Sequence, residues 1–319
     1  MEAFLVTGCA GFIGSSVAEA LLKMGYKVIG VDAFVNNYPK EIKEYNLAAL
    51  RRFKNFVFLE ADIMALDLEA LLKKVNYVIH EAAQPGVRSS WGNMFDSYLR
   101  NNVLATQRLL EACTRVKPKK FVFASSSSVY GNAKQYPVKE DAPLNPISPY
   151  GVTKLAAEKL CLAYMANFDI PIVCLRYFTV YGPRQRPDMA IHKFLRNALF
   201  GQPIIIYGDG TQARDFTYIS DVVIATIRAA TSDVEGMILN IGSGDSVRLL
   251  DLVKHISNVV EKEVKVVLKE EQRGDVRMTL ADISKAKELL DYKPETNLVD
   301  GLKAELDWVV ALYTHLGQL

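Results

Sequence analysis

Short apolar segments alternate with amphipathic segments through the first 180 residues of this 319-residue chain. Apolar runs of about four to eight residues between turn residues are typical of buried strands, and longer runs with helical periodicity are typical of helices. Such alternation predicts a parallel sheet with helices on both faces. The predicted strands are 3–6, 27–31, 56–61, 77–82, 119–125 and 171–177, with helices such as 15–25 and 101–116 between them.

The pattern changes after about residue 180, where loops rich in Gly, Pro, Arg and Asp predominate. Only one further strand, at 237–244, and two helices, near 246–260 and 297–316, are predicted there. We therefore expect an α/β protein with a Rossmann-type, doubly wound parallel sheet in residues 1–178 and segments near 214–244 returning to it. Residues 179–319 would form a smaller C-terminal substrate-binding domain. Because no linker separates the two parts, we expect them to share a cleft.

The composition argues against several classes of function. The chain has 38 basic and 36 acidic residues and no long basic run, so nucleic acid is not the expected partner. Its four cysteines lie far apart and show no metal-ligand spacing, so they are expected to be reduced and no metal is predicted. Neither a signal peptide nor an apolar run of about 20 residues is present, which predicts a cytoplasmic protein without a membrane contact.

Three glycines follow the first predicted strand and open the first predicted helix. In FLVTGCAGFIGSSVAEALL they are Gly8, Gly11 and Gly14. Glycine lets the backbone turn tightly and approach a pyrophosphate, whose charge is favoured by the free N–H groups at a helix N-terminus. The strand, glycine and helix context therefore predicts a dinucleotide site, although the glycines could also serve only a tight turn.

Asp32 ends the second predicted strand, 18 residues beyond Gly14. A carboxylate at this position can accept hydrogen bonds from the adenosine ribose and would repel the extra phosphate of NADP, so NAD is the predicted cofactor. The alternative is that Asp32 only caps the following loop. Asp62, in EADI, is a candidate for the adenine amino group, or else a turn residue.

Tyr150 and Lys154 lie one helical turn apart in SPYGVTK and so share a helix face. Tyrosine is a poor base at neutral pH unless a neighbouring cation stabilises its phenolate, which Lys154 could do. The hydroxyls of Ser125 to Ser128 end a predicted central strand, where open parallel sheets bind ligands. Together these residues predict a proton-transfer site, whereas a tyrosine and lysine at this spacing alone would be common on solvated helices.

With these motifs the sequence resembles the extended short-chain dehydrogenase/reductases, and among them the nucleotide-sugar epimerases of the UDP-glucose 4-epimerase type. The matching stretches occur in family order and are TGCAGFIG, HEAAQ, NNV, SSSSVYG, SPYGVTK, RYFTVYGPRQRPDMA, YGDGTQARDFTYISDVV, NIGSG and GDVRMTLADISKAKELL. They cover nearly the whole chain. The resemblance implies a UDP-sugar substrate and a homodimer built on the helices that contain 98–115 and 150–167.

The resemblance also implies roles for individual residues. For NAD these are Gly8, Gly11, Phe12, Ile13 and Gly14 at the pyrophosphate, Asp32, Asp62 and Ile63 at the adenosine, and Ala82, Ala83, Gln84, Tyr150, Lys154, Tyr177 and Phe178 along the remainder. Asn102 would make either a cofactor contact or a structural contact. For catalysis, Ser126 would orient the sugar hydroxyl and Tyr150 would be the base, with Lys154 as its partner. Arg214 and Asp275 would hold the UDP group, assisted by Arg273, which stands one position closer to Asp275 than the family arginine does.

Two features narrow the predicted chemistry. Related dehydratases and decarboxylases have an acid beside the catalytic hydroxyl, where this chain has Ser127 and Ser128, also predicted to contact substrate. Eliminating water needs a second acid or base, so its absence favours epimerisation at carbon 4. Thr179 and the following YGPRQRPDMA loop are similar to UDP-glucuronate 4-epimerases, with Arg186, and secondly Arg88, as candidates for the sugar carboxylate.

The sequence also allows other functions. UDP-glucose or UDP-N-acetylglucosamine could be the substrate, since Thr279 stands where some family members have a larger Tyr. A nucleotide-sugar dehydratase or decarboxylase and a non-catalytic NAD-binding protein are less favoured. None of the four histidines adjoins a nucleophile elbow, which argues against a Ser-His-Asp hydrolase.

Overall fold

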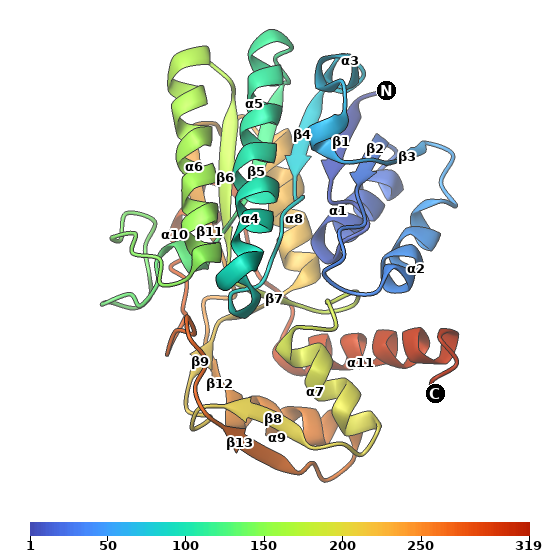
Figure 1. Cartoon of the computed structure of the whole chain (residues 1–319), viewed down its shortest axis with the longest axis vertical. Helices are drawn as coiled ribbons and strands as arrows, with labels where there is room; N and C mark the ends of the chain where they lie inside the picture. Colours follow the sequence, from blue (N-terminus) through green and yellow to red (C-terminus); the bar gives the residue numbers. More distant parts are fainter.

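The computed structural model describes residues 1–319 and contains a central sheet of seven parallel strands (Figure 1). In spatial order these are β11 (Met237–Ile241), β6 (Ile172–Tyr177), β5 (Lys120–Ser126), β4 (Tyr77–His80), β1 (Ala3–Thr7), β2 (Lys27–Asp32) and β3 (Phe56–Glu60). All six strands expected in the first part of the chain are present. The strand order reverses between β1 and β4, which is where open α/β sheets bind ligands.

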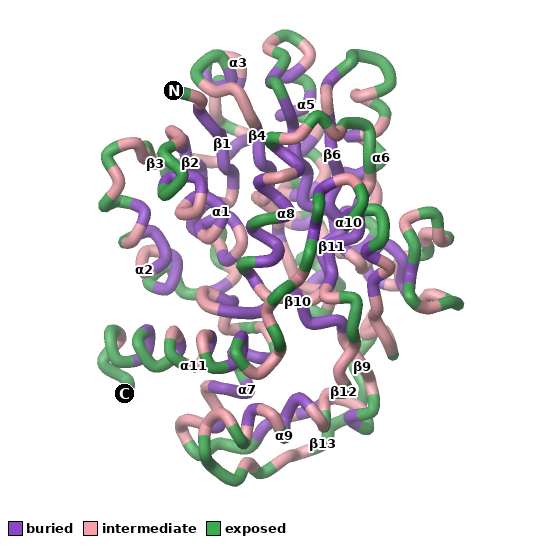
Figure 2. The backbone as a smooth tube through the Cα atoms, turned by 180° about the vertical axis from the view of Figure 1, so that it is seen from behind, coloured by how far each residue is buried: buried purple, intermediate pink, exposed green.

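Helices cover both faces of the sheet, as predicted. One face carries α1 (Phe12–Lys23), α2 (Lys40–Leu50), α8 (Ile219–Thr231) and α10 (Ser284–Leu290), seen in front in Figure 2. The other carries α3 (Leu68–Leu72), α5 (Ala105–Arg115) and α6 (Pro149–Phe168), with the short α4 (Phe95–Tyr98) beside them. Successive side chains of β1 alternate between the faces: Phe4 and Val6 pack under the first set of helices and Leu5 under the second.

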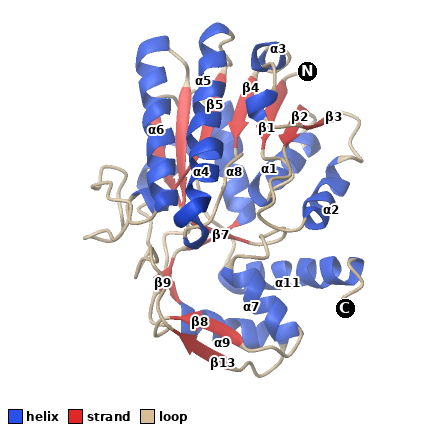
Figure 3. Ribbon diagram, in the orientation of Figure 1, coloured by secondary structure: helices blue, strands red, loops and turns tan.

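A smaller lobe lies below the sheet (Figure 3). Its core is formed by α7 (Ala190–Leu199), α9 (Leu249–Val260), α11 (Leu298–His315) and the parallel pair β8 (Ile204–Tyr207) and β13 (Val266–Lys269). Two further strand pairs connect the lobes, β7 (Thr179–Tyr181) with β10 (Phe216–Tyr218) and β9 (Ala213–Arg214) with β12 (Val247–Arg248). None of the helices is both long enough and apolar enough to span a membrane.

The expectation that the chain after residue 180 consists mainly of loops was wrong. Besides the predicted strand and the two predicted helices, this half contains α7, α8, α10 and six short strands. α8 packs directly on α1, and nine of its residues are buried, so apolar residues surround much of it and the one-sided pattern of a surface helix is blurred. The short strands pair only with distant segments, which no local pattern reveals.

Two contacts return the second half of the chain to the first. β11 pairs with β6 through five residues and extends the central sheet. α11 reaches from the smaller lobe to α2, where Val309, Leu312 and Tyr313 pack against Tyr38 and Ile42. The second half of the chain therefore contacts the first half both at the central sheet and at α2.

Candidate active site

A cavity of about 390 Å³ opens at the carboxyl ends of the central strands, around the switch point between β1 and β4. Most of the predicted site residues line it, including Arg186 of the YGPRQRPDMA loop. They are Gly8, Gly11, Phe12, Ile13, Gly14, Asp32, Asp62, Ile63, Ala82, Ala83, Ser126, Ser127, Ser128, Tyr150, Lys154, Tyr177, Phe178, Thr179 and Arg186. Its volume is in the range of small-molecule sites.

The glycine turn at the start of this cavity requires residues without a side chain. Gly8 has φ +70°, and a Cβ there would lie 2.8 Å from the Ala82 nitrogen. A Cβ on Gly14 would lie 2.2 Å from the Gly8 carbonyl oxygen, because α1 starts hard against the end of β1. Gly11 precedes α1 and offers no capping side chain, so the first N–H groups of α1 are available to an anion.

Asp32 lies at the end of the cavity formed by β2 and α2. Its carboxylate accepts hydrogen bonds from the backbone N–H groups of Ala10 (3.0 Å) and Phe34 (2.8 Å). Burial raises the pKa of Asp32, and the charge of nearby Lys43 opposes that rise. Lys43 also lines the cavity and donates to the Val35 carbonyl (2.6 Å). The sequence reasoning missed Lys43, since a lysine on an amphipathic helix normally faces solvent.

Asp62 has two partners within the protein. One carboxylate oxygen accepts from the Met64 N–H (2.9 Å) and so caps a short turn, while the other pairs with Arg100 at 2.8 Å. Asp62 therefore caps this turn and also lines the cavity.

Gln84 and Asn102 do not line the cavity but lie behind its wall. Asn102 accepts from the Gln84 N–H (2.7 Å), donates to the Gln84 carbonyl (3.1 Å), and donates to Thr153 on α6 (3.0 Å). These bonds tie the segment after β4 to the helix that carries Tyr150 and Lys154. In this structure Asn102 holds the wall in place, which matches the structural role that was one of its two expected roles.

α6 presents Tyr150 and Lys154 to the cavity on one face. The helix begins after Ser148, whose hydroxyl accepts from the Gly151 N–H (3.1 Å), and Pro149 suits its first turn. Burial raises the pKa of Tyr150, while the nearby Ser126 hydroxyl and the charge of Arg186 lower it. Thus the serine at the end of β5 and the tyrosine on α6 are brought together as expected.

Lys154 is almost completely buried, with its Nζ 4.8 Å from the centre of the Phe123 ring. Burial lowers the pKa of Lys154 to about 8, and the charge of Glu81 counteracts this. Glu81 follows β4 and lines the same cavity. The HEAAQ stretch was recognised in the sequence, but its Glu81 was not identified as a site residue.

Arg186 reaches the cavity from the loop after β7. Its Nε and Nη2 donate to the two carboxylate oxygens of Asp188, each at 2.9 Å. The Arg186 side chain is 18% exposed, and its charge acts on the hydroxyls of Tyr150 and Tyr38. Thr179, at the start of β7, also lines the cavity.

The remaining predicted substrate residues lie outside this cavity. Arg88 pairs with Asp275 at 2.8 Å and covers the ring of Tyr207 at 4.3 Å, and the charges of both act on the pKa of Arg214. Arg88 is therefore grouped with Arg214 and Asp275 rather than with Arg186, which makes it a poorer candidate for a sugar carboxylate than its position in the sequence suggested.

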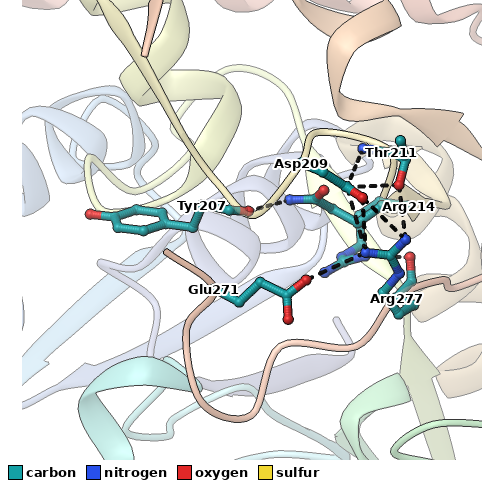
Figure 4. A network of polar contacts seen from close by, with 7 residues as sticks. Tyr207, Asp209, Thr211, Arg214, Glu271 and Arg277 are labelled. Carbon is teal, nitrogen blue, oxygen red and sulfur yellow. Dashed lines mark hydrogen bonds and ion pairs between the residues drawn. The ribbon is translucent and has the colours of Figure 1, made fainter. Parts of the chain in front are cut away.

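Arg214 also lies beside a network that the sequence analysis did not find. Figure 4 shows Arg277 contacting Asp209, Thr211 and Glu271 next to Arg214. Arg273, in contrast, is exposed and makes no hydrogen bond or ion pair. The arginine of this network, Arg277, thus lies two positions beyond Asp275, in the matching stretch GDVRMTLADISKAKELL, but it was not identified there as a site residue.

Residues 4–242, three quarters of the chain, match the protein family described as the NAD dependent epimerase/dehydratase family. The chain belongs to this family. Several proteins are similar to this chain over nearly its whole length. One is named "Uncharacterized UDP-glucose epimerase YtcB", from Bacillus subtilis, and is 48% identical over 97% of this chain and 98% of that protein. Another is the UDP-glucuronate 4-epimerase of Thermodesulfobacterium geofontis, 40% identical over 97% of this chain and 96% of that protein.

A solved structure of the epimerase/dehydratase fold superposes closely. It is the UDP-glucuronic acid 4-epimerase from Bacillus cereus in complex with UDP-glucuronic acid and NAD, with a TM-score of 0.95 and 47% identity over 98% of this chain and all of that chain. The predicted Rossmann-type fold, the membership of an NAD-dependent epimerase family and the NAD cofactor are thereby confirmed. In this epimerase/dehydratase family member the roles of individual residues are predictions, and the structure gives the positions of these residues.

Proposed function

We propose that this protein catalyses the NAD-dependent 4-epimerisation of a UDP-sugar, and that the sugar is UDP-glucuronate, converted to UDP-galacturonate. The observation that carries the proposal is the guanidinium of Arg186 at the cavity wall beside Tyr150, with Thr179 and the serine run completing the same pocket. The named activity of the Bacillus cereus and Thermodesulfobacterium relatives supports the same substrate.

The residues of the cavity fit NAD. The glycine turn and the uncapped start of α1 suit a pyrophosphate, and the Asp32 carboxylate suits the adenosine ribose. When bound, NAD accepts the hydride from carbon 4 and returns it. We propose that the NAD-binding part comprises residues 1–178 with the returning segments near 214–244, and that the rest of 179–319 binds the nucleotide-sugar.

In this proposal Tyr150 takes the proton of the sugar 4-hydroxyl, which Ser126 orients. Lys154 supplies the positive charge that favours the phenolate, a role that a buried ammonium performs strongly because little water screens it. After the 4-keto sugar has rotated so that its opposite face is presented, Tyr150 returns the proton to the 4-oxygen. Ser127 and Ser128 would hold the sugar.

The Arg186 guanidinium has a specific task in the reaction of a uronic acid. Oxidation at carbon 4 creates a β-keto acid, which loses carbon dioxide most easily when the carbon-carbon bond to the carboxylate stands perpendicular to the carbonyl plane. A planar guanidinium can fix a carboxylate through two parallel hydrogen bonds and hold it away from that angle. Asp188 already occupies one edge of Arg186 in this way, and we place the sugar carboxylate at the remaining edge, with Thr179 as a further donor.

At the other end of the substrate, Arg214, Arg88 and Asp275 would hold the UDP group. Burial lowers the pKa of Arg214, but arginine remains charged at neutral pH and can pair with the diphosphate. Asp275 lies close enough to these arginines to orient them or to accept from a ribose hydroxyl. Arg273 is exposed and would assist at the diphosphate.

The proposal is tested by incubating the purified protein separately with UDP-glucuronate, UDP-glucose and UDP-N-acetylglucosamine and identifying the products by NMR. Arg186→Ala should lose most activity on UDP-glucuronate, by about 2 to 4 kcal/mol of transition-state stabilisation, and far less on UDP-glucose. Arg186→Lys is the matched control, because it keeps the charge and removes the planar fork. It should release a decarboxylated pentose. Equal losses on both sugars would instead assign Arg186 to the diphosphate.

A UDP-glucose 4-epimerase is the second candidate, favoured by the name of the Bacillus subtilis relative. In this reading Arg186 stays neutralised by Asp188 and contacts no substrate carboxylate. A dehydratase is less favoured, because the residues beside Ser126 are serines and Glu81, a cavity carboxyl whose charge acts on Lys154, is hydrogen-bonded to Tyr177.

We also propose that the protein is a homodimer. The helix α6 packs against residues 91–104. Six exposed large apolar side chains lie in these two segments: Trp91, Met94, Leu99, Leu104, Val152 and Phe168. Exposed apolar side chains on neighbouring segments are typical of a protein interface. Light scattering after size-exclusion chromatography would test it, with Leu104→Glu expected to give monomers and Leu268→Glu, on β13, to leave the dimer intact. The cytoplasmic location stays a prediction.

A further inference from the structure

Glu81 is a carboxyl group at the cavity wall to which the proposed reaction gives no task. It directly follows β4, and its neighbours around the cavity include Lys154 and Tyr150 of α6 and Tyr177 of β6. The other acidic residues of the cavity, Asp32 and Asp62, are held by backbone N–H groups at the ends of β2 and β3. The Glu81 carboxyl is instead hydrogen-bonded to a single hydroxyl group, that of Tyr177.

A chain of hydroxyl groups leads from Glu81 into α8. The Tyr177 hydroxyl contacts Glu81 Oε1 at 2.9 Å and Thr226 Oγ1 at 2.8 Å. The Thr226 hydroxyl in turn contacts the Val222 carbonyl at 2.7 Å. The chain therefore has three contacts, and Tyr177 and Thr226 supply one proton each.

Counting protons shows what the chain requires of Glu81. With an ionised Glu81, Tyr177 donates to the carboxylate, and the single Thr226 proton must serve either Tyr177 or Val222, so one of the three contacts holds no proton. With a protonated Glu81, the carboxyl donates to Tyr177, Tyr177 to Thr226, and Thr226 to Val222, and every contact is a hydrogen bond. The geometry thus favours a proton on Glu81.

The proton of Glu81 can exchange only on the cavity side. The chain of hydroxyl groups ends at the Val222 backbone carbonyl of α8, which cannot pass a proton on. The titratable groups that act on Glu81 from the packed elements are Tyr177 and Lys154, and Glu81 in turn acts on Tyr150. Burial raises the pKa of Glu81 to about 7, so its charge changes near neutrality.

We propose that Glu81 is a positioning residue that holds one exchangeable proton at the wall of the active site and thereby sets how easily Tyr150 becomes a phenolate. A protonated Glu81 faces Tyr150 as a neutral group, whereas an ionised Glu81 disfavours a second negative charge nearby and favours the charge on Lys154. The two titrations are therefore coupled. The proposal rests on the proposed role of Tyr150 as the base, but not on which sugar is the substrate.

The decisive measurement is the titration of Tyr150 in the full chain without sugar nucleotide, by NMR of protein carrying ¹³Cζ-labelled tyrosine. The Tyr150 signal is assigned by its loss in Tyr150→Phe. In Glu81→Gln, which is neutral at every pH, the Tyr150 titration should move to lower pH than in the wild type. An unchanged Tyr150 titration would overturn the proposal.

Glu111→Gln is a matched control, because Glu111 also accepts a hydrogen bond from a tyrosine, Tyr164 (2.7 Å), but lies at the surface outside the cavity. It should leave the Tyr150 titration unchanged. A shift as large as that of Glu81→Gln would show that the effect is not specific to Glu81 and would contradict the proposal.

The proton itself can be observed by infrared difference spectroscopy between the wild type and Glu81→Gln. The C=O band of a protonated carboxyl should be present at pH 6 and fade above pH 8. Absence of the band at pH 6 would show that Glu81 holds no proton. If these tests succeed while UDP-glucuronate is not converted, only the choice of substrate fails.

Discussion

The guanidinium of Arg186 holds the carboxylate of Asp188 through two parallel hydrogen bonds, Nε to Oδ1 and Nη2 to Oδ2, both of 2.9 Å. The two residues are separated by Pro187, whose fixed backbone angle limits how far they can move apart. This pairing occupies the side edge of the guanidinium and leaves the Nη1 end for another acceptor. Asp188 therefore orients Arg186 before any substrate binds.

Asp188→Asn should lower kcat/KM for UDP-glucuronate by about tenfold, since it removes a charge-assisted pair that orients Arg186. A larger fraction of the product should be decarboxylated, because a loosely held guanidinium fixes the sugar carboxylate less well. Steady-state kinetics and NMR of the products would measure both effects. Tighter binding of UDP-glucuronate by this variant would show instead that Asp188 competes with the substrate.

Tyr150→Phe should lower turnover by roughly 100-fold to 10,000-fold while NAD still binds, as expected for the loss of a general base. Turnover by coupled assay and NAD binding by fluorescence titration would separate the two properties. Tyr164→Phe, on the same helix but outside the cavity, should keep normal turnover. Near-normal turnover of Tyr150→Phe would exclude Tyr150 as the base.

Asp32→Ala should weaken NAD binding and move the preference toward NADP. The substitution removes the acceptor for the ribose hydroxyls and leaves Lys43 without its neighbouring carboxylate, so a 2′-phosphate meets a positive charge rather than a negative one. Isothermal titration with both cofactors measures the change. A loss of equal size for NAD and NADP would mean that Asp32 serves only to hold the backbone at Ala10 and Phe34.

Glu158→Gln should destabilise the fold by about 3 kcal/mol, since it leaves a buried arginine without its counter-ion. Glu158 accepts from Arg176 Nε (3.0 Å) and Nη2 (2.6 Å), and both side chains are almost completely excluded from water. Urea denaturation followed by circular dichroism gives the free energy of unfolding. Glu69→Gln, which breaks the exposed pair with Arg115, is the control and should leave the unfolding midpoint unchanged. Equal midpoints for the two variants would contradict this.

Glu305→Gln should flatten the pH dependence of stability. Glu305 is buried on α11 and accepts from the Gly182 N–H (2.6 Å), and burial raises its pKa well above the ordinary value of 4.5. Between its unfolded and folded pKa values the folded state binds more protons, so stability is lost as the pH rises through this window. Between pH 5 and pH 8 the wild type should therefore lose more unfolding free energy than Glu305→Gln. Parallel curves would show that Glu305 ionises normally in the folded protein.

The sequence by itself determined the parts of this protein that depend on neighbours along the chain. The alternation of strands and helices, the glycines that no side chain could replace at Gly8 and Gly14, and the one-turn spacing of Tyr150 and Lys154 are all local patterns. The structure keeps each of them. Local periodicity and the steric needs of a tight turn do not require knowledge of distant residues.

The tertiary structure decided the contacts made between segments far apart in the chain. α8 loses its amphipathic signal because α1 and the sheet bury most of its surface, and Arg88 joins Asp275 only where the two lobes meet. Lys43 and Glu81 enter the cavity because α2 begins and β4 ends at its wall. A lysine and a glutamate look like ordinary solvated residues in a sequence, and only the fold removes water from around them and gives their charges a role.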